Sequence, residues 1–190
     1  MKIIMISGKS QSGKDAIAKI LEKDLKEKGY GVLTIHFADL VKFYAKQYYN
    51  WNGEKDHDGR ALLQMIGTTI MRSRYPTYWA EIVAKFIDAV EELNCFQIVL
   101  IPDWRFINEY ETVYDYAKKL NQEVITIRIN RYNKDGSPYI NPQMNEQQAS
   151  HISECELDNF AFNWVIENKG TLEDLKDSAY YIIDTTEGLW

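Results

Sequence analysis

Short apolar runs alternate with amphipathic stretches along most of the chain, and this alternation predicts strands separated by helices. The apolar runs predict strands at residues 2–7, 32–37, 97–102, 123–129 and 162–167. The stretches with helical spacing predict helices at residues 15–28, 39–50, 60–74, 78–93, 108–120, 151–158 and 171–184. Continuous apolar strands separated by helices indicate an α/β protein whose parallel sheet is covered by helices on both faces.

A polar segment at residues 131–149 interrupts this alternation. It carries Gly136, Pro138 and Pro142, and it is long for a loop in a compact domain. Loops of this length are usually lids or disordered segments. We expect it to close over substrates together with the helices at 60–93, which would exclude water from the site.

The predicted helix at 60–74 would present polar groups along one side. On a straight helix, spacings of three and four residues align Arg60, Gln64, Gly67, Met71 and Arg74. The adjacent face, which we expect to be buried, carries Leu63, Ile66 and Ile70. Arg72 would then point roughly 120° away from Arg60. A break at residues 67–68 would change that direction, and the sequence leaves both alternatives open.

Composition and charge limit the classes of function. The chain has 190 residues, 45% of them hydrophobic, which fits one folded domain. It has 22 Lys and Arg against 28 Asp and Glu, and the net charge of −6 argues against a general nucleic-acid or anionic-membrane binder. Cys95 and Cys155 lie far apart, which indicates neither a disulfide framework nor a zinc motif and fits a reducing cytoplasm. No apolar run is long enough for a signal peptide or a membrane span, so we expect a cytoplasmic protein.

The clearest chemical signal lies between the first predicted strand and the first predicted helix. Gly8, Gly13 and Lys14 have the G-x-x-x-x-G-K spacing of a P-loop, in the strand and helix context that the motif requires. Glycines let the backbone approach a phosphate, and the loop N–H groups and the helix N-terminus attract its charge. We expect ATP here, with Lys14 at the β- and γ-phosphates. The residues expected to surround ATP in this cradle are Gly8, Ser10, Gln11, Ser12, Gly13, Lys14, Asp15 and Ala16.

Two acids are candidate ligands for Mg²⁺. Asp15 stands where P-loops usually have Ser or Thr, and its carboxylate is a hard oxygen ligand, although it also fits a helix N-terminal charge. Asp103 ends an apolar predicted strand, so it would lie beside the P-loop at the carboxyl edge of the sheet. There it could orient the water shell of Mg²⁺, cap a helix or turn, or act as a base toward a hydroxyl acceptor.

Charged residues at predicted strand ends are candidate phosphate contacts. The chain has only six arginines, and the planar fork of Arg105 suits a phosphate, although a surface salt bridge fits it as well. Arg131 starts the long loop, from which it could stack on an adenine or reach phosphates. Asp39 and Lys42 follow the second strand, where they fit either substrate contacts or charges at a helix start.

Several segments together resemble the phage-type deoxynucleoside monophosphate kinases. They are GKSQSGKD at 8–15, RALLQMIGT at 60–68, Trp79, IPDWRFINE at 101–109, HISECELDNF at 151–160 and WVIENKGTLEDL at 164–175. The resemblance spans residues 3 to about 175. Animal-type phosphomevalonate kinases share the Asp-ended cradle, the D-x-R after the third strand and a similar SEC-x-LDNF segment. The RALLQMIGT run and His151 favour the nucleotide kinases.

This resemblance implies a P-loop NTPase fold of the nucleoside monophosphate kinase type. Such a fold has a parallel five-stranded core, a substrate-binding helical insertion and a lid. We expect a single kinase domain over residues 1–190. Its expected parts are a core at 1–37, 95–130 and 160–190, a helical region at about 38–94 and a lid at about 131–150.

The resemblance also implies roles for individual residues. Those expected to carry the reaction are Lys14, Asp15, Asp103 and Arg105, with Asp15 and Asp103 toward the metal. Arg131 would lie near the ATP base or phosphates. Those expected to bind the acceptor are Asp39, Lys42, Arg60, Gln64, Arg72, Trp104, Arg105, His151 and Glu154. Arg60, Arg72 and Arg105 would hold its phosphate. His151 and Glu154 would line the lid side, although Ser153 with Glu156 also fits a helix cap.

We expect the protein to use ATP and Mg²⁺ to phosphorylate a small phosphate acceptor, a deoxynucleoside monophosphate. A phosphate monoester is largely dianionic at pH 7, so positioning and charge neutralisation would suffice without a general base. One alternative is phosphorylation of phosphomevalonate. The other is a nucleotide-dependent switch, against which the second set of arginines argues. The sequence predicts neither the preferred base nor the oligomeric state, and it leaves a homodimer open.

Overall fold

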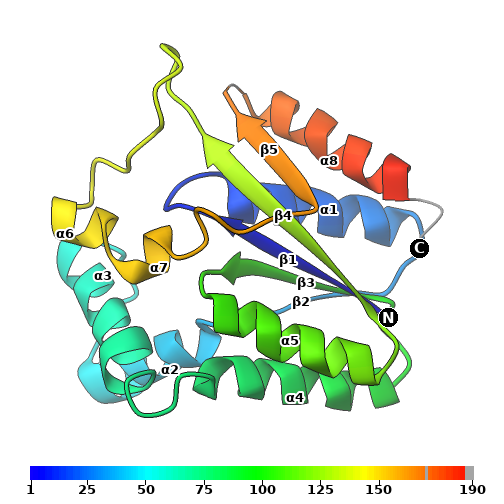
Figure 1. Ribbon diagram of the computed structural model, residues 1–190, viewed down its shortest axis with the longest axis horizontal. Coiled ribbons are helices and arrows are strands. Elements are labelled where there is room, and N and C mark those ends of the chain that lie inside the picture. Colours follow the sequence, from blue (N-terminus) through cyan, green and yellow to red (C-terminus); the bar gives the residue numbers. More distant parts are fainter. Residues whose placement is uncertain (170, 187–190) are drawn as a thin grey trace.

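Five parallel strands form the centre of the fold (Figure 1). The computed structural model describes residues 1–169 and 171–186. The strands are β1 (Lys2–Gly8), β2 (Val32–Thr34), β3 (Ile98–Trp104), β4 (Glu123–Arg131) and β5 (Trp164–Asn168), in the spatial order β2-β3-β1-β4-β5. Ile4 of the central strand pairs with Leu100 of β3 and with Ile125 of β4. The predicted parallel α/β sheet is confirmed.

Helices cover both faces of the sheet because side chains alternate along each strand. Figure 1 shows two helices on either side, α1 (Lys14–Glu27) with α8 (Leu172–Thr186), and α4 (Tyr78–Glu92) with α5 (Ile107–Lys119). Ile4 packs in the core beneath α1 and α8, and its neighbour Ile3 packs in the core beneath α4 and α5. Both isoleucines are buried, which fixes the register of the central strand.

A helical region lies at the carboxyl edge of the sheet and consists of α2 (Asp39–Tyr49), α3 (His57–Gln64) and the π-helix η1 (Met65–Ile70). The expected single helix at 60–74 therefore begins earlier and changes its pitch. One inserted residue in a helix turns everything after it by about 100°. Arg72 consequently lines the same pocket as Arg60 instead of pointing away from it.

The change of pitch also decides which apolar residues are buried. Ile66 packs with Val41, Ala45 and Trp79 in a small core of its own, as expected for a buried position. Ile70 is 39% exposed, so the expectation that it lies in the core is wrong. The π-helix turns this side chain outward, and a regular α-helical period does not anticipate that.

The segment at 131–149 is more ordered than a plain loop. It contains a bridge between Tyr132 and Pro138, and it ends in the short helix α6 (Glu146–Ala149). The next helix, α7 (Ile152–Cys155), is shorter than expected. In Figure 1 the segment runs out beyond β4 and returns beside α3. This return places the predicted lid against the helical region.

None of the helices described here combines the length and apolar character needed to cross a membrane. The expected core segment at 160–190 forms β5 and α8. Gly170 and residues 187–190, which belong to that segment, lie outside the described residues.

Candidate active site

The loop between β1 and α1 has the geometry of a phosphate cradle. A side chain on Gly8 would collide with Ser12 and with the carbonyl of Ile129. Gly13 has a φ of 110°, and a Cβ atom there would meet Asn168 Nδ2 at 3.0 Å. The Asn168 amide in turn donates to the carbonyl oxygen of Ser12 at 2.9 Å. Glycine is therefore required at both ends of the loop, and β5 supports the loop from below.

Lys14 lies across this loop in a buried position. Its ammonium group donates to the carbonyl oxygens of Gly8 at 2.7 Å and Lys9 at 2.8 Å. Burial holds the pKa of Lys14 well below its ordinary value, and the Arg105 cation lowers it further. Glu154 and other nearby carboxylates oppose that lowering. An anionic ligand in the cradle would oppose this lowering, because it stabilises the charged form of the lysine.

A cavity of about 630 Å³, here called the cradle cavity, opens beside the loop. Asp15 in the first turn of α1 and Asp103 near the end of β3 both line it, as the sequence predicts for acids at one sheet edge. Further cradle residues on its wall are Ser10, Gln11 and Lys14, and Lys42 of α2 faces it from the other side. Ser12, Gly13 and Ala16 line a smaller hollow on the outer side of the loop.

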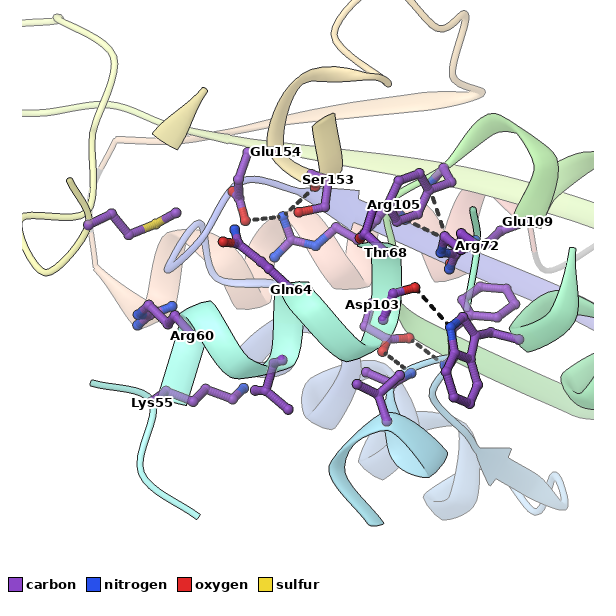
Figure 2. Close-up of a pocket in the computed structure, with 18 residues that line it drawn as sticks. Lys55, Arg60, Gln64, Thr68, Arg72, Asp103, Arg105, Glu109, Ser153 and Glu154 are labelled. Atoms are coloured by element: carbon purple, nitrogen blue, oxygen red, sulfur yellow. Dashed lines mark hydrogen bonds and ion pairs between the residues drawn. The ribbon is translucent and has the colours of Figure 1, made fainter. Parts of the chain in front are cut away.

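A second cavity of about 190 Å³, here called the helical pocket, lies between the sheet edge and the helical region (Figure 2). Arg60, Gln64 and Arg72 line it from the helical side, and Glu154 lines it from α7. Its apolar wall consists of Phe37, Val41, Leu63, Trp79, Phe106 and Met144. The two cavities share the wall residues Ala38, Lys55, Arg60, Asp103 and Arg105. Three cations therefore stand where the two cavities meet.

Asp103 fastens the backbone that separates β2 from α2. Its Oδ1 accepts the N–H of Phe37 and its Oδ2 accepts the N–H of Ala38, both at 2.9 Å. The structure thus bears out the turn-cap interpretation of Asp103. The carboxylate also lines both cavities, so the cap does not remove it from the site.

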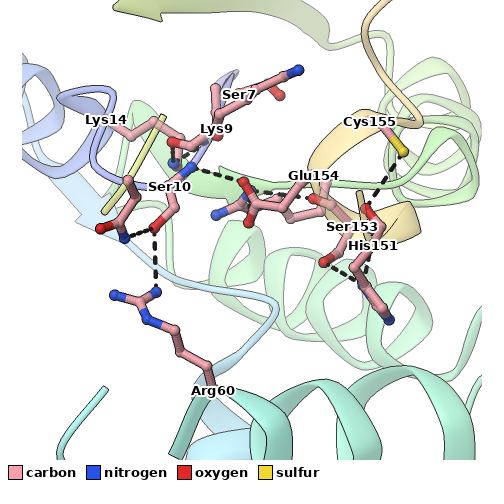
Figure 3. Close-up of polar contacts among 12 residues, drawn as sticks. Ser7, Lys9, Ser10, Lys14, Arg60, His151, Ser153, Glu154 and Cys155 are labelled. Carbon is pink, nitrogen blue, oxygen red and sulfur yellow. Dashed lines mark hydrogen bonds and ion pairs between the residues drawn. The ribbon is translucent and has the colours of Figure 1, made fainter. Parts of the chain in front are cut away.

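Ser10 connects three parts of the chain (Figure 3). Its backbone N–H donates to Glu154 Oε2 at 2.8 Å, and Glu154 Oε1 accepts Arg105 Nη1 at 2.7 Å. Its hydroxyl accepts Arg60 Nη1 at 3.2 Å and Asn141 Nδ2 at 3.0 Å. The cradle, the helical region and the 131–149 segment are thus joined by hydrogen bonds.

Arg131 lies against the cradle, as expected. Its Nη1 donates to the carbonyl oxygen of Gln11 at 2.9 Å, and its guanidinium lies 4.0 Å from the ring centre of Tyr139. The Tyr139 hydroxyl donates to Gln11 Oε1 at 2.7 Å. Two hydrogen bonds therefore hold the start of the 131–149 segment to the phosphate loop, and the cation–π contact joins the two side chains that make them.

Glu109 of α5 is a residue that sequence reasoning missed. It is 1% exposed, and its Oε2 accepts the N–H of Arg105 at 2.8 Å and that of Phe106 at 3.1 Å. Its Oε1 accepts Arg72 Nη2. Burial raises the pKa of Glu109 to about 7, although Arg72 and the two backbone N–H groups lower it. An acid in the first turn of a predicted helix is the sequence signal that could have drawn attention to it. Lys55 was missed as well.

The structure corrects the expectation for Trp104. Its side chain is completely buried, in contact with Tyr110, Phe160 and Phe162, and its indole N–H donates to the carbonyl oxygen of Phe106 at 2.7 Å. A ring enclosed in this way holds α5 and the segment after α7 together and has no surface to offer a substrate.

Asp39 and His151 are engaged in local contacts at helix starts. The exposed carboxylate of Asp39 accepts Lys42 Nζ and the N–H of His36, both at 3.1 Å. His151 caps α7, because its Nδ1 accepts the N–H of Ser153 at 3.2 Å. The bonds of Asp39 match its alternative interpretation, a helix-start charge. The expected cap by Ser153 with Glu156 is wrong, because His151 is the N-cap residue and Glu156 accepts the N–H of Ile107 instead.

Comparison with known proteins adds independent evidence. The sequence model of a family described as "Deoxynucleotide monophosphate kinase" matches residues 34–179. The match begins after the cradle, so the P-loop motif does not produce it.

The APS kinase of Mycobacterium tuberculosis, solved in complex with AMPPNP and APS, has a TM-score of 0.53 at 13% identity, over 98% of this chain and 97% of that chain. The tunicamycin resistance protein of Deinococcus radiodurans has a TM-score of 0.52 at 14% identity, over 97% and 95%. At these identities the two structures show a shared fold, and the expected P-loop kinase fold is confirmed.

Proposed function

Because the chain belongs to the deoxynucleotide monophosphate kinase family, we propose that it transfers the terminal phosphoryl group of ATP to the phosphate of a deoxynucleoside monophosphate. The chain is a nucleotide kinase. The identity of its acceptor and the places where donor and acceptor bind are what we propose. The meeting of the two cavities at Lys55, Arg60 and Arg105 carries it. Phosphoryl transfer needs two anions close together, and cations between them offset the repulsion.

The cradle cavity is the proposed place of ATP. Lys14 and the N–H groups of the loop would hold the β- and γ-phosphates, and Arg131 would lie near the base or phosphates. Asp15 and Asp103 are hard oxygen donors on one cavity wall and fit Mg²⁺. Among residues 1–169 and 171–186 no three metal-binding side chains gather, so phosphate oxygens and water would complete the coordination shell. Mg²⁺ would neutralise charge on the phosphates.

The helical pocket is the proposed place of the acceptor. Arg60, Arg72 and Arg105 would hold its phosphate, and planar guanidinium groups bind phosphate oxygens in pairs. The base would lie against the apolar wall, with Gln64 and Thr68 as hydrogen-bonding groups on that wall. Trp104 is not part of this proposal, because it is buried in the core.

The reaction would be a direct displacement at phosphorus. An oxygen of the acceptor phosphate forms a bond to the γ-phosphorus, and the bond from that phosphorus to the β–γ bridging oxygen breaks, which leaves ADP. The acceptor is largely dianionic at pH 7, so no group has to remove a proton. Lys14 and the arginines would act by placing the reactants and neutralising the charge of the transition state.

We assign the three proposed parts of the kinase domain to separate ranges of the chain. Residues 1–37, 95–130 and 160–190 would form the core, residues 38–94 the acceptor-binding region and residues 131–150 the lid. The hydrogen bonds from Asn141 and Arg60 to Ser10 support this division, since they link the three parts at the cradle. Protection of the 131–149 segment from proteolysis by a two-substrate analogue would test the lid.

The test of the function is ADP release from Mg-ATP in the presence of dGMP, dTMP, dCMP, dAMP, the ribonucleotides or phosphomevalonate. We expect at least one deoxynucleotide to accelerate release, and Lys14→Ala to abolish that acceleration. Acceleration by phosphomevalonate alone would contradict the nucleotide acceptor. Slow hydrolysis unaffected by any acceptor, together with a nucleotide-dependent protein partner, would instead indicate a switch.

A further inference from the structure

We propose that Glu109 is a positioning residue that sets two arginines, Arg72 and Arg105, for the acceptor phosphate. The inference rests on the proposed function, because it takes the helical pocket as the acceptor site. Glu109 lies on the first turn of α5, with its carboxylate buried at the wall of the helical pocket, and Figure 2 shows its contact with Arg72. It would act through the arginines and touch no reacting atom.

One buried carboxylate reaches two elements that are far apart in the sequence. Glu109 Oε2 accepts the N–H groups of Arg105 and Phe106, at 2.8 and 3.1 Å, and thereby fixes the chain where β3 passes into α5. Glu109 Oε1 accepts Arg72 Nη2 from the chain that follows η1. The two arginines therefore take their relative position from one side chain.

Arg72 has only weak polar anchors besides Glu109. Its Nη1 donates to the carbonyl oxygen of Pro76 at 3.3 Å and to Asn108 Oδ1 at 3.4 Å, both long for hydrogen bonds. Its Nε is buried and has no protein acceptor among the described residues. The guanidinium also stacks on the Phe106 ring at 4.0 Å. Among the residues that the structure describes, Glu109 therefore provides the one short hydrogen bond to this guanidinium.

The charge of Glu109 changes within the working range of pH. Burial raises its pKa to about 7 and the Asp103 carboxylate adds to the rise, although the Arg72 cation and the backbone N–H groups of Arg105 and Phe106 lower it. A protonated Glu109 no longer attracts Arg72 as an anion. The advantage that Glu109 gives to acceptor binding should therefore decline as the pH falls below about 7.

Glu109→Gln tests this role while keeping the shape of the side chain. The variant retains an oxygen for the backbone N–H groups and loses the charge that holds Arg72. We expect the KM for the acceptor to rise about tenfold or more at pH 8, and the KM for ATP to stay within about twofold. Glu156→Gln is the matched control, because Glu156 Oε1 also accepts a backbone N–H at the start of α5, that of Ile107 at 2.7 Å. It should leave both KM values unchanged.

Two further measurements separate positioning from simple stabilisation. The ratio of acceptor KM values between Glu109→Gln and the unmodified enzyme should shrink toward one from pH 8 to pH 6. Adding Glu109→Gln to Arg72→Gln should raise the acceptor KM little further, since both changes remove the same contact. Should Glu109→Gln fail to fold, the acceptor KM ratio of Arg72→Gln to the unmodified enzyme should shrink over the same range.

Four results would overturn the role of Glu109 and leave the proposed function intact. They are equal increases in both KM values, an unchanged acceptor KM, full additivity with Arg72→Gln, and KM ratios independent of pH. An unmodified enzyme that no acceptor accelerates would overturn the proposed function and this inference with it. The two failures are thus distinguished before any variant is measured.

Discussion

The carboxylate of Glu154 accepts the backbone N–H of Ser10 at 2.8 Å, so an acid of α7 occupies an amide of the phosphate cradle. The same carboxylate accepts Arg105 Nη1 at 2.7 Å, and its side chain is 9% exposed. Glu154 therefore occupies two groups that would otherwise face phosphates, the Ser10 N–H and the Arg105 guanidinium. An arriving phosphate has to share these groups with a negative charge.

Replacing Glu154 by Gln should therefore tighten the binding of ATP in the absence of an acceptor. Removing a like charge close to the phosphates is worth about 1 kcal/mol in a partly exposed site, or roughly a fivefold lower Kd. Calorimetric titration with a non-hydrolysable ATP analogue would measure it. Glu156→Gln, two residues away, should show no change. Weaker binding to the Glu154 variant would mean that Glu154 supports the cradle rather than competing with its ligand.

Lys14→Ala should separate activity from stability. We expect kcat to fall by about two to three orders of magnitude, as for the loss of a group that stabilises transition-state charge. The Tm should not fall, because the cost of burying the ammonium group offsets its two hydrogen bonds to carbonyl oxygens. Thermal melts and initial rates check both, with the exposed Lys23→Ala on the same helix as control. A retained kcat would contradict the P-loop role.

Asp15 and Asp103 should respond differently to replacement by Asn. Asp15 is exposed, so Asp15→Asn should leave Tm unchanged and raise the Mg²⁺ concentration needed for half-maximal rate several-fold. Asp103→Asn should also lower Tm, because the amide oxygen can accept only one of the Phe37 and Ala38 N–H groups. The amide nitrogen, which is a donor, would face the other N–H and leave it without an acceptor. The expected loss is about 1–3 kcal/mol of unfolding free energy. A lower Tm in Asp15→Asn would show that Asp15 has a structural role.

The unfolding free energy of the protein should depend on pH in a way that Glu109 causes. Its pKa is about 7 in the fold, above its ordinary value of 4.5, so between these values the folded state binds the extra proton. The contribution of Glu109 to the unfolding free energy is therefore greatest below about pH 4.5 and declines as the pH rises to about 7. Urea unfolding at several pH values should show this decline, and Glu109→Gln should remove it. A decline of the same size in the variant would assign it to other groups.

The sheet and the cradle could be predicted because each depends on local sequence. Apolar runs such as residues 98–101 have the continuous character of strands buried on both faces. The spacing from Gly8 to Lys14 identifies a P-loop without any knowledge of the remaining chain. The acids Asp15 and Asp103 met in one cavity because parallel strands end at the same edge.

The remaining parts of the site depend on contacts that sequence patterns do not record. Glu109 has the sequence context of an ordinary helix-capping acid, and only the packing of Arg72 against Phe106 gives it a second partner. Trp104, expected to bind the acceptor, stands next to Arg105, but consecutive side chains of an extended chain point in different directions. Neighbours in the sequence therefore did not share an environment.

The π-helix at Met65–Ile70 makes the site sensitive to the length of the chain as well as to its composition. Deleting one codon within this stretch would allow the run from His57 onward to continue as a regular α-helix. Everything after the deletion would then turn by about 100°. Arg72 would leave the pocket that it shares with Arg60, even where the deleted residue, such as Met65 or Thr69, does not line that pocket. In this stretch an in-frame deletion would be a larger change than most point substitutions, and an inserted residue is a simple route by which such a pocket could have acquired a further arginine.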